Sequence, residues 1–516
     1  MRTTGILKHL QLLGMGMALC LYGYSIDPFT SDSTATPPTS WDRAAYYTNL
    51  NLLANPSILA PSSLPPATLL QTGYTSNTGN QWLTPYQGTY QEQYHANVTS
   101  YNRKGSNAAF GKASFKRRNN HATKWQLNQH IDRIAPYTIT DTIGGNQQTE
   151  DYLFEGGVTR RVGQFLLGIS AGYQSAIMWK TLNPRPKNTA AETYANAGIS
   201  FKVKEHTIAL GLSYSRYTQY LSVTSRSNNN RADMIYAQKG FGITHNSISG
   251  MKSDYSRTYK GHLYGASATI LTDDIMSSYL KVSAYHETIN TVESNETIPF
   301  VLSKWQVGIN AGLAAHATKS TYRIESTGNL FTSNGTEQFY EHVKIDPTTQ
   351  LYNWVLLTKG VLYTNREREV GIKASWLREA SSTRWYVLTI GSTYTNSNQA
   401  YNKTSNSIKS QNVLLFTNAH ISIKRGKYTF ATTANINQNM VLSSTVNLPN
   451  ATWPRKQDLE MHYKYMLSNS TQWGAKVSLL KALPKAQHIG VSVGHSRLHA
   501  GSITTYATSL TLEVLL

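Results

Sequence analysis

The sequence predicts an all-β protein, a transmembrane antiparallel β-barrel of about 16 strands within a range of roughly 14 to 18. The first observation behind this prediction is a two-residue alternation. In FLLGISAGY, every second side chain from Phe165 to Tyr173 is apolar or aromatic, and the residues between them are mostly glycine or serine. Such alternation places the two kinds of side chain on opposite faces of a strand.

The second and third observations are the length of these segments and the position of their aromatic residues. The segments extend over about 10 to 15 residues, which exceeds an average globular strand and suffices for a tilted strand that crosses a bilayer. Tyr173, Trp179, Tyr214 and Tyr220 lie toward segment ends, as expected for rings at a lipid–water boundary. A soluble β-sandwich also alternates, so length and aromatic position favour the barrel.

The barrel is predicted over residues 86–516, behind two shorter segments. Residues 1–25 have the basic start, short apolar stretch and small residues of a signal peptide, and they contain the single cysteine, Cys20. Residues 26–85 are rich in Ser, Thr, Pro and Asn without sustained periodicity. They are predicted to form an irregular segment that serves as a plug or a periplasmic arm. Export and a barrel together indicate a multi-pass protein of the cell outer membrane.

Residues 136–188 carry a recognisable pattern: PYTITDTIGG is followed by EDYLFEGGVTRRVGQFLLGISAGYQSA and then by NPRPKN. This pattern resembles an uncharacterised family of outer-membrane β-barrel proteins from the Bacteroides group. Asn183 stands where the family usually has an aspartate, which puts any ligand or ion-pair role of that aspartate in doubt. The resemblance implies the barrel fold and the outer membrane, and it implies no reaction.

The NPRPKN loop presents Arg185 and Lys187 on a backbone stiffened by two prolines. One interpretation is a contact with an anion or with a lipopolysaccharide phosphate, because a guanidinium matches phosphate geometry. The alternative is a loop that folds over the barrel and pairs with a carboxylate in the lumen. The sequence favours this second, packing interpretation.

The PYTITDTIGG stretch is the other candidate site. Pro136 and Tyr137 are expected to turn the chain at the barrel rim, and Asp141 is expected to cap the turn that follows. A cation or sugar site is the less favoured alternative for these residues.

No catalytic, cofactor or metal site is predicted. The sequence has no nucleophile elbow, no phosphate-binding glycine loop and no metal-ligand spacing. His420 lies on the polar side of its segment, where a luminal or rim residue is the simpler interpretation than a base. The net charge of +20 is spread through turns, and no helical or aromatic-basic motif supports nucleic-acid binding.

We therefore expect a channel or an accessory component of a nutrient-uptake complex, beside a TonB-dependent receptor and surface lipoproteins. The expected non-protein partners are outer-membrane lipid and lipopolysaccharide. The alternative is a structural or assembly barrel with a plugged lumen and no transport. A surface-exposed hydrolase is the least favoured function, since no residue spacing singles out a catalytic serine or histidine.

Overall fold

The computed structural model describes residues 54–59, 66–80, 88–182, 184–224, 235–245, 255–272, 276–344, 352–451, 455–484 and 487–516. The predicted signal peptide, residues 1–25, lies outside the described residues. The same holds for residues 26–53 of the segment predicted to be irregular and for Asn183.

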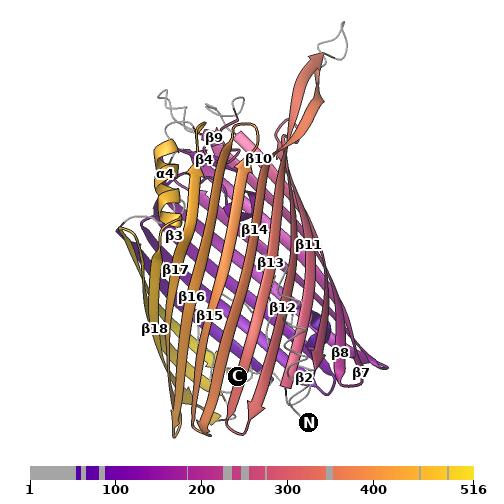
Figure 1. Cartoon of the computed structure of the whole chain (residues 1–516), viewed down its shortest axis with the longest axis vertical. Coiled ribbons are helices and arrows are strands. Elements are labelled where there is room, and N and C mark those ends of the chain that lie inside the picture. The colour runs from indigo at the N-terminus through magenta and orange to yellow at the C-terminus, as the bar shows by residue number, and fades with distance from the viewer. Residues whose placement is uncertain are drawn as a thin grey trace.

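Within the described residues, 18 antiparallel strands form one sheet that closes because β1 pairs with both β2 and β20 (Figure 1). The predicted barrel is confirmed, with a strand number at the upper end of the predicted range rather than 16. The strands are β1 Ala67–Gly79, β2 Tyr90–Lys104, β3 Asn107–Thr123, β5 Gly145–Val162, β6 Phe165–Lys180, β7 Arg185–Val203, β8 His206–Thr224, β10 Tyr255–Thr272, β11 Met276–Glu293, β12 Phe300–Ala317, β13 Ser320–Lys344, β14 Tyr352–Ser381, β15 Arg384–Tyr401, β16 Asn406–Arg425, β17 Tyr428–Asn447, β18 Ser470–Ala482, β19 His488–Ala500 and β20 Ile503–Leu515.

Strand β1 starts the barrel earlier than residue 86, the boundary expected from the sequence. Its residues, ATLLQTGYTSNTG, contain mostly Thr, Ser, Gln, Asn and Gly, so the apolar alternation is weak. Pairing with strands on both sides compensates, because its backbone groups are satisfied by β2 and β20.

Short turns gather at the end of the barrel where β20 finishes. Two residues connect β5 to β6 and two connect β7 to β8 at this end. The opposite end carries the longer connections, and Figure 1 shows β4, β9 and helix α4 (Arg455–Met466) there. In outer-membrane barrels the short turns face the periplasm and the long loops face outside. We use these two names for the two ends.

The apolar face of the alternating strands is the outer face of the barrel. In β6, Leu167 and Ile169 are exposed by 42% and 62%, while Gly168 and Ser170 between them are buried. Leu212 on β8 is exposed by 66%. Large apolar side chains pointing away from the lumen along nearly every strand form the surface that contacts lipid.

Two strands extend past the others at the extracellular end. β13 has 25 residues and β14 has 30, and their outer parts form a hairpin that rises above the barrel in Figure 1. Helices are few, and within the described residues none combines the length and apolar character needed to cross a membrane.

Extracellular connections also fold inward. Between β3 and β5 the chain forms the short helix α3 (Ile131–Ile134) and the strand β4 (Ile139–Asp141). β4 pairs with β9 (Ile235–Ala237), which belongs to the connection between β8 and β10. These inward segments carry the candidate site.

Candidate functional site

Tyr137 lies inside the lumen, in the connection between β3 and β5. Its ring stacks on that of Phe300 of β12, with centroids 4.4 Å apart and planes 11° from parallel. Its backbone carbonyl accepts a hydrogen bond of 2.9 Å from the hydroxyl of Tyr259 on β10. A side chain at Gly335 would collide with the Tyr137 hydroxyl, so glycine at that position makes room for the ring. Pro136, which precedes Tyr137, therefore turns the chain into the barrel rather than along its edge.

Asp141 anchors the same connection to the barrel wall. Its carboxylate pairs with Lys180 at the end of β6, and both side chains are essentially inaccessible to solvent. The backbone N–H of Gly144 donates a 3.2 Å hydrogen bond to the Asp141 carboxylate, so the carboxylate also holds the turn after it. Gly144 has a φ of +72°, which a residue with a side chain rarely adopts.

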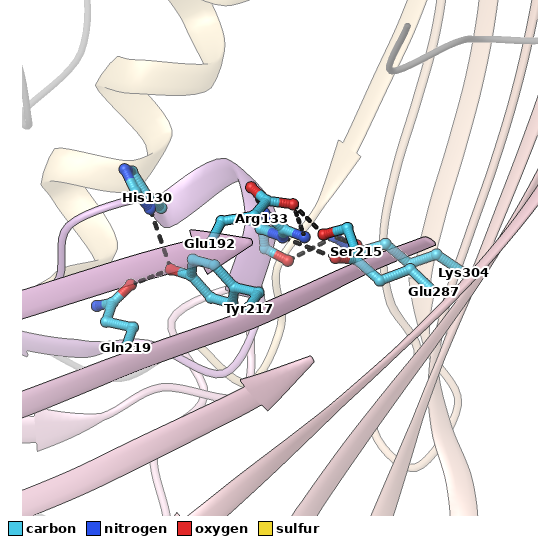
Figure 2. Close-up of polar contacts among 8 residues, drawn as sticks. All are labelled: His130, Arg133, Glu192, Ser215, Tyr217, Gln219, Glu287 and Lys304. Carbon is cyan, nitrogen blue, oxygen red and sulfur yellow. Dashed lines mark hydrogen bonds and ion pairs between the residues drawn. The ribbon is translucent and has the colours of Figure 1, made fainter. Parts of the chain in front are cut away.

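Arg133 of helix α3 is the centre of a charged cluster in the lumen (Figure 2). Its guanidinium binds Glu192 of β7 at 2.5 Å and Glu287 of β11 at 2.6 Å. Lys304 of β12 lies 3.2 Å from Glu287 and also donates to the Arg133 carbonyl. Ser215 of β8 donates to Glu192. Four strands thus hold one inward arginine by charge-assisted hydrogen bonds.

Aromatic and histidine contacts complete this cluster. The Arg133 guanidinium lies 4.1 Å from the ring centroid of Tyr217, whose hydroxyl donates to Gln219 at 2.6 Å. His130 Nδ1 lies 3.1 Å from the same hydroxyl. Burial lowers the pKa of His130 to about 4, with Arg133 adding to this effect and Asp151 opposing it. Burial alone would lower the pKa of Arg133, but Glu287 and Glu192 raise it above its ordinary value. The cluster therefore holds a charged arginine and a neutral histidine.

Two further extracellular connections contact the connection between β3 and β5 or the wall beside it. In the segment after β9, Lys239 pairs with Glu337 of β13 at 2.7 Å, and Tyr401 of β15 donates to the same carboxylate at 2.7 Å. In helix α4, Asp458 accepts a 2.6 Å hydrogen bond from the indole of Trp125. The three connections thus contact one another as well as the wall.

An apolar core fills the lumen between these contacts, and we call the core with its three connections the extracellular plug. Its members come from the three connections and from the inner faces of nine strands. The buried core residues are Ile134, Tyr137, Ala176, Ala190, Tyr217, Phe241, Tyr259, Ile289, Phe300, Leu302, Tyr363, Tyr401, Ile408, Leu448 and Leu459. Apolar burial on this scale is the main stabilising contribution to the closed arrangement.

The opposite, periplasmic end of the lumen holds the segment 54–59, which we call the periplasmic plug. It contains a short 3-10 turn, Pro56–Ile58, whose N-cap Asn55 accepts from the N–H of Ser57 at 3.0 Å. Proline after the asparagine pre-sets the backbone for this turn. Its residues contact β5, β6, β7 and β8, which places the turn on one side of the inner wall.

The wall under this turn is a ladder of three glycines. Gly168 of β6 pairs with Gly198 of β7, which pairs with Gly211 of β8. A Cβ atom at Gly198 would lie 1.9 Å from Asn55 Oδ1, and one at Gly168 would lie 2.3 Å from the Pro56 carbonyl carbon. Gly211 lies under the same asparagine. The turn can approach the wall this closely because these three positions have no side chain. We call this part of the inner wall the seat of the periplasmic plug.

Hydrogen bonds and a small apolar cluster hold the turn in its seat. Thr159 of β5 donates to the Pro56 carbonyl, Ser200 of β7 to the Ser57 carbonyl at 3.2 Å, and Tyr101 of β2 to the Leu59 carbonyl at 3.0 Å. The cluster that packs around the plug consists of Ile58, Leu59, Tyr101, Ala108, Phe110, Ala209 and Leu515. Both ends of the barrel interior are thus occupied by the chain itself.

Comparison with known proteins places this architecture in a family. Residues 56–514 match a family of unknown function, DUF6850. The chain belongs to this family. The match begins within the periplasmic plug and ends within β20, so it covers the extracellular plug, most of the periplasmic plug and at least part of each of the 18 strands of the described barrel. No curated protein matches the sequence.

Solved structures resemble this member of DUF6850 in architecture. The ferric preacinetobactin receptor BauA from Acinetobacter baumannii has 11% identity and a TM-score of 0.40, over 87% of this chain and 80% of that one. The ferric citrate transporter FecA has 10% identity and a TM-score of 0.36, over 87% and 79%. The ferric enterobactin receptor PfeA from Pseudomonas aeruginosa has 8% identity and a TM-score of 0.36, over 86% and 80%. Identities and TM-scores this low say nothing about a solute or a mechanism for this chain. The closed sheet of 18 antiparallel strands with an apolar outer face is by itself the fold of an outer-membrane β-barrel.

Arg185 and Lys187 do not lie in either plug. Both are exposed at the extracellular start of β7, and they alternate with the buried Pro186 and Asn188. This alternation places them on the outer face of the barrel. They are therefore separated by the barrel wall from Pro136, Tyr137 and Asp141, although the sequence presents the two motifs as one pattern.

The residues that build the two plugs are largely ones that sequence reasoning did not single out. Arg133 and Glu192 are single charged residues in different segments, and nothing in the chain marks them as partners. The glycine ladder does leave a trace: Gly168, Gly198 and Gly211 each start the same three-residue pattern of glycine, a branched aliphatic residue and serine. Three repeats of this pattern on consecutive strands predict a common seat on one wall.

His420 occupies a structural position. It is 3% exposed on the inner face of β16, its ring centroid lies 4.6 Å from that of Trp385, and its Nδ1 lies 2.9 Å from the Thr433 hydroxyl. Among the described residues, no group of three or more His, Cys, Asp or Glu side chains is arranged to hold a metal ion.

Proposed function

We propose that this protein is an outer-membrane transport barrel that is closed at rest and opens when its plugs leave the lumen. The observation that carries the proposal is the apolar core formed by Tyr137, Phe241, Phe300 and their neighbours inside the extracellular half of the barrel. Apolar side chains packed across a lumen exclude water and therefore block ions and polar solutes.

The ion pairs of the extracellular plug support the proposal that this plug can leave the lumen. Three ionic groups around Arg133, those of Glu192, Glu287 and Lys304, fix the position of α3, and buried ion pairs specify geometry more than they add stability. Nearer the periplasmic end, the inner wall stays polar, as in the pair of Lys373 and Glu325 at 2.8 Å.

Planar-bilayer recording tests the proposal. We expect the purified barrel to be silent, and we expect stable steps when residues 127–140 are replaced by a short Gly-Ser linker and residues 54–59 are deleted. Heat-modifiable mobility on a gel checks that each variant is folded. Steady large conductance of the unmodified protein would contradict a closed resting state.

The second candidate is a structural or assembly barrel with a permanently filled lumen, which the same apolar core favours. The doubly opened variant separates the two functions. If it folds and remains silent, the structural role holds and the transport role is wrong.

The narrower form of the proposal is an accessory role beside a TonB-dependent receptor and surface lipoproteins. The hairpin at the outer ends of β13 and β14 supports it, because Tyr352, Trp354 and Leu357 are exposed there by 47%, 41% and 60%. Site-directed cross-linking from position 354 in whole cells tests this form. Cross-links to a receptor or surface lipoprotein would support it, and cross-links confined to lipid would count against it.

A further inference from the structure

The outer wall formed by β7, β8 and β10 carries a basic patch. Arg185 and Lys187 of β7, Arg216 of β8 and Lys260 of β10 are all exposed, and each alternates with buried neighbours that face the lumen. The side chains of this patch therefore point toward the membrane side of the barrel rather than into the lumen.

The register of the strands brings part of the patch close together. Arg216 is directly opposite His262 of β10, and Lys260 is one row further toward the extracellular end, opposite Thr218. Side chains opposite each other on one face of a sheet have Cβ atoms about 5 Å apart. Lys187 and Arg185 lie further along in the same direction, opposite Ser222 and Thr224 of β8.

The outer wall around the patch is poor in acidic residues where the structure describes it. Within the described residues, the outward positions of β7, β8 and β10 contain no Asp or Glu. The wall formed by β3 and β5 is different, because its outward Arg117 lies 3.5 Å from the outward Glu150. Like charges on adjacent strands repel each other, so an anion bound from outside the protein would reduce the repulsion within this patch.

Aromatic residues locate the patch relative to the membrane. Tyr214 and Tyr264 lie one row on the periplasmic side of Arg216 and His262, with their centroids 5.3 Å apart and exposures of 40% and 58%. The Tyr214 hydroxyl also contacts His262 Nδ1 at 3.0 Å. Exposed tyrosines mark the boundary between hydrocarbon and headgroups, so the basic side chains reach the headgroup layer of the outer leaflet.

We propose that this patch binds the phosphate groups of lipopolysaccharide in the outer leaflet. Guanidinium and ammonium groups supply charge-assisted hydrogen bonds to the phosphates, and the tyrosines contact the sugar and the upper acyl chains. The site is independent of the proposed transport role, since none of its side chains faces the lumen. Under this proposal Arg185 and Lys187 bind a phosphate, which is the less favoured of the two interpretations of their sequence, instead of packing against a carboxylate in the lumen.

Native mass spectrometry of the full barrel in detergent tests the site with lipid A as the probe. We compare the unmodified protein with the variant R185Q/K187Q/R216Q/K260Q, in which glutamine keeps the length and polarity of each side chain. Retention of lipid A should fall by about tenfold or more in the variant, because several charge-assisted contacts are lost. The control is Arg160→Gln, an exposed outward arginine near the periplasmic end of β5, which should leave retention unchanged.

Two further probes separate the sources of the anion. Chemically dephosphorylated lipid A should bind about as weakly to the unmodified protein as lipid A binds to the variant. Inorganic phosphate at millimolar concentration should not displace lipid A, and displacement would assign the patch to a soluble anion and overturn the lipid site. If the fourfold variant fails to fold, retention of lipid A is measured on R216Q/K260Q instead. Unchanged retention in a folded variant overturns the proposal.

Discussion

The two plugs occupy opposite ends of one lumen and are held there by different interactions. The extracellular plug is built from three long connections, and charged pairs centred on Arg133 and on Asp141 fix it over an aromatic core. The periplasmic plug is a single six-residue segment, 54–59, and its seat is defined by the absence of side chains at three glycines. One plug is positioned by charge and the other by shape.

This difference indicates which substitutions and which changes of pH should displace each plug. Charge deletion and protonation act strongly on buried ion pairs and on buried histidines, so they act on the extracellular plug. The segment 54–59, which is Ala-Asn-Pro-Ser-Ile-Leu, contains no titratable side chain. Steric change in its seat, or loss of the hydrogen bonds described above, should displace it. The two ends of the lumen can thus be opened separately.

The largest effect is expected from Arg133→Ala. The substitution leaves Glu192 and Glu287 without their shared cation in a buried site, which should reduce the free energy of docking of residues 124–144 by about 3–5 kcal/mol. Hydrogen–deuterium exchange across that connection measures the loss. The matched control is Arg117→Ala, because its pair with Glu150 is solvent-exposed and worth at most about 1 kcal/mol. Equal exchange in both variants would mean that charge does not position the plug.

Acid should loosen the same plug, and the part due to His130 alone should be somewhat smaller than the effect of Arg133→Ala. Burial lowers the pKa values of His130 and His245 to about 4, below the ordinary value of 6.5. A histidine with a lowered pKa favours the docked form above pH 6.5, and this contribution is lost as the pH falls from 6.5 to about 4. For His130 alone the loss approaches roughly 3 kcal/mol.

Exchange at pH 7 and pH 4.5 measures this pH dependence at both ends of the lumen. The connection 124–144 should lose protection at pH 4.5, while residues 54–59 should keep theirs. The variant His130→Gln, which retains a polar side chain beside Tyr217, should show a smaller difference between the two pH values. Parallel loss of protection at both plugs would show that they are not independent.

Much of the fold follows from the sequence because its main constraint is local. Outward apolar side chains must alternate with inward small or polar ones along any strand that faces both lipid and lumen, and β6 does so from Phe165 to Tyr173. The alternation is weak where several lipid-facing residues are Thr or Ser, as at Thr68, Thr72, Ser76 and Thr78 of β1. A length-based search for apolar faces therefore undercounts the strands and starts the barrel too late.

The site is less predictable because its contacts are non-local. Arg133 meets Glu287 across 154 positions and Asp458 meets Trp125 across 333 positions. Pro136, Tyr137 and Asp141 stand out in the sequence, since a proline and a capping acid have local consequences. The direction in which they turn the chain, into the lumen, depends on the space between strands that are distant in the sequence. Only the closed barrel defines that space.

Gly198→Ala should displace the periplasmic plug. The carbon of the new methyl group would lie only 1.9 Å from Asn55 Oδ1, so the turn must leave or the wall must move, at a cost of about 1–3 kcal/mol. Limited proteolysis within residues 54–59 measures the displacement. Gly156→Ala on β5, two strands away, is the matched control, because the nearest atom to its new methyl group would be 3.5 Å away. Cleavage in the control as well would indicate general loosening of β5 to β8 rather than loss of a seat.

The smallest effect is expected from Tyr101→Phe, which removes one hydrogen bond and leaves the apolar ring in place. The Tyr101 hydroxyl donates to the Leu59 carbonyl at 3.0 Å, and both residues are buried. Loss of this donor should weaken docking of the segment by about 1 kcal/mol. Proteolysis should then accelerate by roughly fivefold, well below the change caused by Gly198→Ala, and exchange at residues 124–144 should stay the same. If the tyrosine variant instead matched the glycine variant, hydrogen bonding rather than shape would position the periplasmic plug, and the contrast between the two ends of the lumen would disappear.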